Sequence, residues 1–437
     1  YFNRQWNLLN EGTGIQGGGT PGADMNIPDA WEITMGSADI TIAILDSGVD
    51  TLHPDLIDRL EPGFDAAMDS TDGFPFYNYE QDGHGTCCAG IAAATANNSI
   101  GIAGVAPNCR IIPIRVFYYI DLGGIQPWAE VEWFVNGINY AWQVAQADVA
   151  SNSWGVPDAL LDLFPGEDLL VNEAIDNAAA QGRGGLGMPL LFSSGNDGNL
   201  DSIPIWPARY HNTVAVNSTS MCDERKSFNS CDGEPWEGNW GNHLDIAAPG
   251  VRIPATDMMG SYGFSNNEYY HTFNGTSSAC PNAAGVMALI LSEYPTLERL
   301  DAESTIKQSC AKVGSYNYDT PTSDGSWCPQ LGHGRVDALA ALQLVPHLGV
   351  SDSDNENHPL EVFNLLDGSV ILSSDMQQPT ILSLALYDLG GRIVDTRSIN
   401  TPRGKHRQSL SLPIVSSGIY MLKVTWPEGN RTFLSVR

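Results

Sequence analysis

The sequence predicts an α/β domain with a mainly parallel sheet flanked by helices, followed by a small all-β sandwich of the immunoglobulin-like type. Short apolar runs, typical of strands buried on both faces, alternate with helical patterns through most of the chain. Residues 351–358 then form a polar, acidic stretch, after which the pattern changes to short alternating strands. We therefore expect an α/β domain at residues 1–347, a linker at 348–360 and a sandwich at 361–437.

The clearest strand of the α/β domain covers residues 39–47, an isoleucine-rich run in which Asp46 precedes a turn signal. Similar runs predict strands at residues 110–117, 149–154, 189–194 and 213–217, and helical patterns cover residues 128–146, 169–181 and 279–293. Strands that alternate with helices favour a parallel sheet, in which ligands bind near the carboxyl ends of the strands.

Composition and charge exclude several classes of partner. The 437 residues include 21 Lys and Arg against 51 Asp and Glu, so the formal net charge is −30. This charge repels phosphate backbones and anionic lipids, and neither nucleic acid nor a membrane is expected as a partner. No apolar run approaches the roughly 20 residues that cross a bilayer, and the start at Tyr1 lacks signal-peptide features. We expect a soluble, already processed monomer.

The eight cysteines are an even number, which indicates disulfides and an oxidising, extracytoplasmic location. Two pairs are close enough in sequence to bracket loops, and we predict that Cys222 bonds Cys231 and that Cys310 bonds Cys328. Zinc is the alternative, but the chain contains no Cys-x2-Cys pair.

Three separated segments each contain a residue type that acyl transfer needs. They are Asp46 in D-S-G-V-D, His84 in D-G-H-G-T and Ser277 in N-G-T-S-S-A-C-P. A serine hydroxyl is a weak nucleophile, so it needs an imidazole to remove its proton and a carboxylate to fix the tautomer of that imidazole. Each residue alone would be explained as a cap, a loop residue or a turn. Together, and in this order, they predict a catalytic site.

The surrounding segments resemble the subtilisin-like family of serine proteases over about residues 1–345. The matching segments are D-S-G-V-D-T-L-H-P-D-L from Asp46, D-G-H-G-T-C-C-A-G from Asp82, A-N-N-S-I-G-I-A-G-V-A-P from Ala96, S-N-S-W-G from Ser151, S-S-G-N-D-G from Ser193, A-A-P-G from Ala247 and G-T-S-S-A-C-P from Gly275. The resemblance implies a serine endopeptidase with the triad named above and with Asn196 as an oxyanion donor. It also implies polypeptide substrates, and the enzyme's own propeptide as inhibitor and chaperone.

The same resemblance implies a cleft for an extended peptide substrate. The residues assigned to its edges and pocket are Ser153, Trp154, Gly155, Gly123, Gly124 and Asp158. Trp154 could instead be a core aromatic. Asp158 falls where kexin-like relatives place a carboxylate that selects basic residues, so limited processing after basic residues is an alternative to broad breakdown of extracellular proteins. An inactive protein that binds through a subtilase fold is a third, weaker alternative.

Calcium is the cofactor that the resemblance implies, because carboxylate, amide and carbonyl oxygens suit a hard cation. The assigned ligands are Asp55, Asn98, Ile100 and Ile102. This loop could also be a simple Gly/Asn turn. Asp201 and Glu224 could support a second calcium ion. Cys88 and Cys280 follow His84 and Ser277 closely, and we interpret them as buried small hydrophobes rather than as a redox-sensitive pair.

The C-terminal part resembles the sorting domain of the type IX secretion pathway. The resemblance rests on G-S-V-I-L-S, L-A-L-Y-D-L-G-G-R-I-V, S-S-G-I-Y-M-L-K-V-T and R-T-F-L-S-V-R. Strands are predicted at residues 369–372, 380–387, 418–425 and 432–436. The resemblance implies the type IX secretion machinery as a partner and an extracellular or cell-surface location. A generic immunoglobulin-like accessory module is the alternative.

Overall fold

The computed structural model describes residues 2–13, 19–163, 165–198, 203–345, 360–364, 369–376, 378–388, 392–411, 419–426 and 429–436. Contacts between residues divide the chain into two compact units, Tyr1–Leu342 and Gln343–Arg437, which are described separately here. The predicted linker at 348–360 lies outside the described residues except for Leu360, so its limits stay a prediction.

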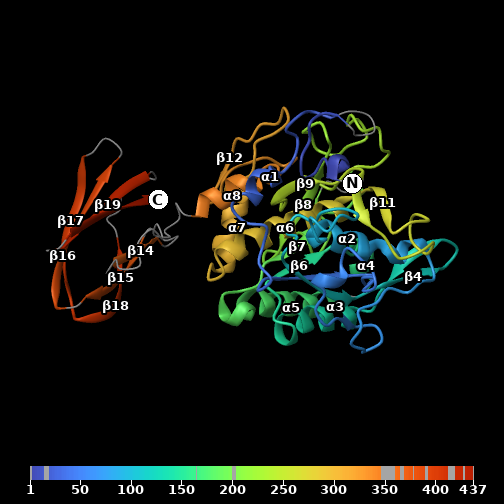
Figure 1. Ribbon diagram of the computed structural model, residues 1–437, viewed down its shortest axis with the longest axis horizontal. Helices are drawn as coiled ribbons and strands as arrows, with labels where there is room; N and C mark the ends of the chain where they lie inside the picture. Colours follow the sequence, from blue (N-terminus) through green and yellow to red (C-terminus); the bar gives the residue numbers. More distant parts are fainter. Residues whose placement is uncertain are drawn as a thin grey trace. The chain divides into compact units, whose positions relative to one another are not determined.

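The larger unit is built on a seven-stranded sheet with the order β2-β3-β1-β6-β7-β8-β9, in which every adjacent pair is parallel. The strands are β1 (Thr41–Asp46), β2 (Phe64–Asp65), β3 (Arg110–Arg115), β6 (Val149–Asn152), β7 (Leu190–Ser193), β8 (Val214–Thr219) and β9 (Ile246–Pro249). Helices cover both faces of the sheet, as Figure 1 shows. The predicted α/β class with a mainly parallel sheet is confirmed.

The helices of this unit are α1 (Ile27–Trp31), α2 (His84–Ala93), α3 (Val131–Asn139), α4 (Asp158–Leu161), α5 (Glu167–Gln181), α6 (Thr276–Glu293), α7 (Arg299–Gln308) and α8 (Ala338–Leu344). Helix α6 is buried on all sides from Thr276 to Leu291, because small and apolar residues occupy almost every position. The helix predicted at 128–146 is shorter than expected: α3 ends at Asn139, and a π-helical turn, Tyr140–Val144, follows it.

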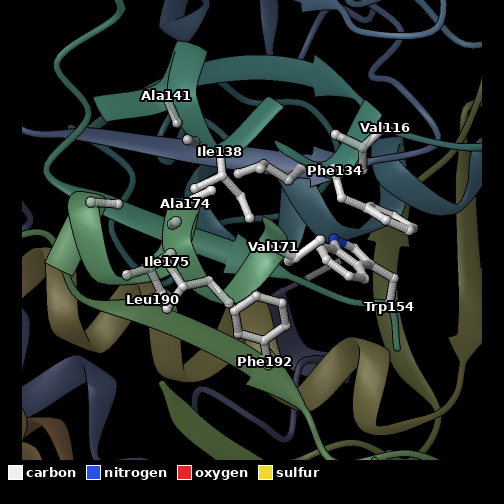
Figure 2. Close-up of a cluster of buried hydrophobic side chains, with 14 of the residues drawn as sticks. Val116, Phe134, Ile138, Ala141, Trp154, Val171, Ala174, Ile175, Leu190 and Phe192 are labelled. Carbon is white, nitrogen blue, oxygen red and sulfur yellow. The ribbon is translucent and has the colours of Figure 1, made fainter. Parts of the chain in front are cut away.

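The face of the sheet under α3 and α5 carries a large apolar cluster (Figure 2). Ala43 and Leu45 of β1 belong to this cluster, whereas Ile42 and Ile44 point to the other face, because successive side chains alternate along a strand. Five of the six residues of β1 are buried, which explains why this strand appears in the sequence as a continuous apolar run.

Three small hairpins lie outside the central sheet and were not predicted. They are β4 (Tyr118–Asp121) with β5 (Ile125–Trp128), β10 (Ile253–Thr256) with β11 (Tyr269–Phe273), and β12 (Thr320–Thr322) with β13 (Gly325–Trp327). All four residues of β5 are exposed, so this strand has no alternating apolar face that the sequence could reveal.

The disulfide between Cys222 and Cys231 is confirmed. The predicted Cys310–Cys328 disulfide is wrong, because both cysteines are free and buried. The Cys310 thiol is turned back along α7, where it donates to the carbonyl oxygen of Ile306 at 3.1 Å. Sequence proximity placed the two cysteines in one region but did not determine the direction of their side chains.

The smaller unit consists of two antiparallel sheets with the orders β14-β15-β18 and β17-β16-β19-β20. The strands are β14 (Leu360–Asn364), β15 (Ser369–Met376), β16 (Thr380–Asp388), β17 (Ile393–Thr401), β18 (Gly404–Ser411), β19 (Ile419–Trp426) and β20 (Gly429–Val436). Leu382, Leu384 and Leu386 are buried at alternate positions of β16, the pattern that a sheet with one covered face requires. The predicted all-β fold is confirmed.

Candidate active site

Three of the predicted site residues follow the carboxyl ends of neighbouring parallel strands. Asp46 ends β1, Ser153 comes directly after β6, and Asn196 lies in the turn after β7. Because β1, β6 and β7 are adjacent and parallel, their carboxyl ends meet at one edge of the sheet. The sheet order therefore brings Asp46 close to segments that lie more than a hundred residues later in the chain.

A short hydrogen bond joins the predicted acid and base. His84 Nδ1 lies 2.7 Å from Asp46 Oδ1, and the backbone amide of Ser47 donates to the same oxygen at 2.7 Å. Asp46 is fully buried, whereas 13% of the His84 side chain is exposed. A carboxylate beside Nδ1 favours the imidazole tautomer that carries its proton on Nδ1. Nε2 is then free to accept a proton.

The close approach of α2 to β1 depends on Gly85, the residue after His84. A Cβ atom on Gly85 would lie 2.3 Å from the carbonyl oxygen of Gly48 and 2.9 Å from Cβ of Asp46, distances that real contacts do not reach. The Gly85 amide donates to Ser47 Oγ at 3.0 Å, which fixes the start of the helix. The glycine after His84 therefore has a steric role in forming the Asp46–His84 contact.

Ser277 is the second residue of α6, and the carbonyl oxygen of Ser277 is held from outside the helix. Pro281, four residues later, has no N–H to donate to this carbonyl. Instead, Ser153 Oγ donates to Ser277 O at 2.9 Å and Cys88 Sγ donates at 3.4 Å. Pro281 lies inside α6, five residues after its start, and these two side chains satisfy the carbonyl that the missing N–H leaves without a helical donor.

Two N–H donors converge beside Gly275. Asn196 Oδ1 accepts from Thr276 N at 2.9 Å and from Thr276 Oγ1 at 3.1 Å, so the amide oxygen is occupied and Nδ2 faces away from it. A Cβ atom placed on Gly275, whose φ is 118°, would lie 3.4 Å from both Asn196 Nδ2 and the backbone nitrogen of Ser277. The two donor nitrogens thus lie close to one point at the positive end of the α6 dipole, an arrangement that suits an oxyanion.

The remaining side of the imidazole is lined by aromatic rings. The His84 ring centroid lies 5.3 Å from that of Phe273 and 6.4 Å from that of Phe117, both in edge contacts. Within the described part of the chain, neither His84 Nε2 nor Ser277 Oγ has a hydrogen-bond partner. Both atoms are therefore available to a substrate, and hydrogen bonds between catalytic groups often tighten only when substrate binds.

Cys88 lies directly below the imidazole, with its sulfur 3.9 Å from His84 Nδ1. Burial raises the pKa of the Cys88 thiol well above its ordinary value, and the nearby Asp46 carboxylate acts in the same direction. Cys88 and Cys280 are both free and fully buried, as predicted, but their thiols also donate hydrogen bonds, Cys88 to Ser277 O and Cys280 to Asn152 O. The Cys88 thiol therefore stays protonated and does not compete with Ser277 as a nucleophile.

The residues predicted to border the substrate have different environments. Trp154 belongs to the apolar cluster of Figure 2, where its ring stacks on Phe134 at 4.0 Å between centroids, so its side chain is a core aromatic. Gly123 and Gly124 form the exposed turn between β4 and β5, and both amides donate to Asp121 Oδ1. Gly155 is partly exposed and follows Trp154.

Asp158, the candidate pocket carboxylate, is the first residue of α4 and forms an ion pair with Arg209. Of the Asp158 side chain, 56% is exposed. The guanidinium of Arg209 already neutralises the Asp158 carboxylate, with which a basic side chain of the substrate would have to pair.

The proposed calcium ligands lie around a buried carboxylate. Asp55 is fully buried; Asn98 Nδ2 donates to Asp55 Oδ1 at 2.5 Å, and the Ile102 amide donates to Asp55 Oδ2 at 2.9 Å. Burial raises the pKa of Asp55 above its ordinary value, and in the described residues no lysine or arginine pairs with it. A cation would offset this uncompensated charge.

The loop from Asn97 to Ile102 is shaped as a cradle around Asp55. Asn97, Ser99 and Gly101 all have positive φ, and a Cβ on Gly101 would lie 2.1 Å from Asp55 Oδ2. The Asp55 carboxylate and the neighbouring Asn98 side-chain amide offer oxygens of the type that calcium prefers, so these residues fit calcium. Asn98 Oδ1 accepts from the Ile100 amide at 3.1 Å, so ligation through this oxygen requires the side-chain amide to turn over. Asp201, named for a second ion, lies outside the described residues.

Several contributors to the site were missed by the sequence analysis. Thr276 orients the Asn196 amide, and Ser153 acts through its hydroxyl on Ser277 rather than as a substrate edge alone. The Thr276 role could have been suspected from its place beside Ser277. The role of Cys88 could not, because a buried cysteine and a hydrogen-bonding cysteine look alike in sequence.

Comparisons with known proteins identify relatives of both units of the chain. Residues 37–334 match the family profile described as subtilase family, and residues 361–432 match the profile described as secretion system C-terminal sorting domain. Thermitase of Thermoactinomyces vulgaris is 34% identical over 319 residues, which cover 72% of this chain and 92% of thermitase. A calcium-dependent protease of Nostoc sp. is 33% identical over 372 residues, which cover 78% of this chain and 51% of that relative.

The chain thus spans about half the length of the Nostoc relative. A solved serine protease of Aeromonas sobria, in complex with a chaperone, shares the fold with a TM-score of 0.66 at 17% identity, over 99% of this chain and 91% of that one. Within the described residues, no helix is both long and apolar enough to cross a membrane. The two profile matches indicate an extracellular or cell-surface protein. With the subtilase profile matching from residue 37 to residue 334, the chain belongs to the subtilase family.

Proposed function

We propose that this chain is a secreted serine endopeptidase whose nucleophile is Ser277. The observation that supports this most directly is the 2.7 Å hydrogen bond between buried Asp46 and His84, at the sheet edge where Asn196 Nδ2 and the Ser277 amide converge. In the proposed reaction, His84 Nε2 takes the Ser277 proton as Oγ attacks the peptide carbonyl, and the two N–H groups bind the oxyanion. His84 then protonates the leaving amine, and water hydrolyses the acyl-enzyme.

Broad cleavage of extracellular proteins fits the site better than processing after basic residues. The ion pair with Arg209 engages Asp158, which was the main support for a basic preference. The net charge of −30 still attracts cationic chains. Such long-range attraction raises the rate at which these chains meet the enzyme, but it does not select the bond that is cleaved. An inactive binding protein is disfavoured by the complete donor and acceptor set around Ser277.

A fluorophosphonate probe combined with a cleavage-site profile tests this function. We expect the probe to label Ser277 and the enzyme to cut a denatured protein mixture at many residue types. Cleavage confined to positions after Arg or Lys would instead support the processing alternative. Absence of both labelling and cleavage from the folded, calcium-loaded protein would contradict the proposed activity.

Calcium is proposed as a structural ion held by Asp55 with Asn98, Ile100 and Ile102. When bound, it would supply positive charge against the buried carboxylate and rigidify the loop, and it would take no part in the proton transfers. We also infer that a propeptide acts as chaperone and inhibitor. A relative's complex with a chaperone supports assisted folding in this fold, although that chaperone belongs to the other protein.

The sorting-domain match supports export as the role of the smaller unit. Every residue proposed for catalysis lies in the larger unit, so a chain truncated after Gly349 should hydrolyse peptides as fast as the full chain. In a host with a type IX secretion machinery, the same truncation should leave the protein inside the cell. Normal secretion of the truncated chain would contradict the sorting role, and loss of hydrolysis by a folded truncated chain would show that the tail contributes to catalysis.

A further inference from the structure

The turn that carries Asn196 has little regular structure of its own. It follows the end of β7 at Ser193, and Gly195 within it has a φ of 101°, a conformation that other residues rarely adopt. Asn196 itself is exposed, as a residue that faces substrate must be. Thr276 fixes only the oxygen of its side-chain amide. The backbone that sets the position of Nδ2 therefore needs support from elsewhere.

That support comes from Asn239, a residue far away in the chain. The backbone N–H of Asn239 donates to Gly195 O at 2.9 Å, and the backbone carbonyl of Asn239 accepts from Ser194 Oγ at 2.9 Å. On the other side of Asn196, the backbone amide of Asp197 donates to Asn239 Oδ1 at 2.9 Å. One residue, only 3% exposed, thus holds the chain both before and after the oxyanion donor.

Packing adds to these hydrogen bonds. A Cβ atom on Gly195 would lie 2.6 Å from Asn239 Nδ2, so the side chain of Asn239 fills the space beside the glycine. If the turn moved toward Asn239, Gly195 would clash with the Asn239 side chain. If the turn moved away, its hydrogen bonds to Asn239 would break. Such contacts on both sides of a residue restrict the position of its backbone.

Asn239 is the last residue of the segment 219–239, which we term the stapled segment because the Cys222–Cys231 disulfide cross-links part of it. Lys226 and Asp232 form a fully buried ion pair at 3.0 Å inside the segment. The amide of Gly238, the residue before Asn239, donates to Lys226 O at 3.2 Å. Separating the two charges of a buried ion pair is costly, because each charge would be left buried without a partner. The pair therefore opposes changes in the shape of this segment.

The stapled segment also reaches the Asn196 turn directly. The Gly198 amide donates to Glu237 O at 3.1 Å, and Glu237 forms an ion pair with Arg225 at 2.5 Å. Two successive parts of one cross-linked segment therefore hold the turn, Glu237 at its end and Asn239 across its middle.

We propose that Asn239 is a positioning residue that sets the location of the Asn196 oxyanion donor, supported by the stapled segment. The inference rests on the proposed oxyanion role of Asn196. A misplacement of about 1 Å can cost roughly 10²-fold in rate, because the donor must meet the oxyanion at hydrogen-bond distance. Asn239 touches no reacting atom, so its effect must pass through Asn196.

A double-mutant cycle tests this dependence. We expect Asn239→Ala to lower kcat by roughly ten- to a hundredfold, with KM nearly unchanged, because the oxyanion forms only after the substrate has bound. Affinity for a peptide boronate, which forms a tetrahedral adduct on the nucleophile, should fall in parallel with kcat. In an Asn196→Ala background, Asn239→Ala should cause no further loss of kcat.

Two further variants make the test decisive. Asn10→Ala is the control, because Asn10 is also a buried asparagine, 2% exposed, and its Oδ1 accepts a backbone amide at 2.9 Å, from Gly12. Its Nδ2 donates to Met221 O at 3.2 Å, at the end of the stapled segment opposite to Asn239 in the chain, so the variant removes a contact to this segment but none to the Asn196 turn. It should lower the melting temperature without changing kcat. If Asn239→Ala does not fold, Ser194→Ala replaces it, since it removes the bond to the Asn239 carbonyl and should show a smaller loss that also vanishes without Asn196.

The outcomes separate the inference from the function on which it rests. If Asn196→Ala leaves kcat unchanged, the proposed oxyanion role itself is wrong. If Asn196→Ala lowers kcat but Asn239→Ala does not, the positioning role alone is refuted. Fully additive losses in the double mutant would also refute it, because they would show that Asn239 acts on the reaction independently of Asn196.

Discussion

Ser277→Ala is expected to lower kcat by roughly 10⁶ while the fold stays intact, because the chemistry of this family depends on the attacking hydroxyl. Within the described residues Ser277 Oγ makes no hydrogen bond, so its removal should change the free energy of unfolding by less than about 0.5 kcal/mol. The measurements are single-turnover hydrolysis of a chromogenic peptide and thermal melting. Fluorophosphonate should not label the Ser277→Ala protein, even if that protein keeps some hydrolytic activity.

Ser292→Ala is the matched control for this prediction, because Ser292 lies near the other end of the same helix. Its hydroxyl donates to Ala288 O at 2.7 Å and accepts from the Ser37 amide at 3.0 Å. The variant should lose about 1 kcal/mol of stability and keep its kcat. A Ser277→Ala enzyme with more than about a hundredth of the wild-type kcat would contradict the assignment of the nucleophile.

Calcium removal is expected to lower the melting temperature by roughly 5 °C, because an ion at about 100 times its Kd stabilises the native state by about 2.7 kcal/mol. Asp55→Asn should abolish this dependence on calcium. Melting curves with calcium and with excess chelator measure both effects.

Asp39→Asn is the matched control for calcium, because it removes the same charge from an exposed position. Its response to calcium should equal that of the wild type. If the wild-type melting temperature is the same in chelator as in calcium, the loop around Asp55 is a turn without an ion. If Asp55→Asn keeps the full calcium response, the ion binds elsewhere.

The sequence predicted those parts of the fold in which local pattern and burial agree. The run that ends at Asp46 is buried on both faces, and the helix after Gly275 is apolar on all sides, so neither pattern has a competing interpretation. The β4–β5 hairpin was missed because β5 is exposed, β4 is at most partly buried, and neither strand alternates between buried and exposed residues. The π-helical turn at Tyr140–Val144 was missed because its composition is that of an ordinary helix.

The candidate site was predicted as a set of residues, but not as a set of contacts. Resemblance placed Asp46, His84 and Ser277 together, and the structure adds how they are held. Pro281 deprives the Ser277 carbonyl of its helical partner, and the hydroxyl of Ser153 replaces it. This compensation joins segments that are not adjacent in sequence, and hydrogen bonds between such segments leave no local pattern.

The most direct test of the central claim is to trap the acyl-enzyme. The wild-type enzyme is mixed with an activated ester substrate, quenched in acid within the first turnover, digested and examined by mass spectrometry. We expect one acyl group per molecule, on the peptide that contains Ser277, and none in Ser277→Ala. An acyl group on any other residue, or turnover without a covalent intermediate, would contradict it.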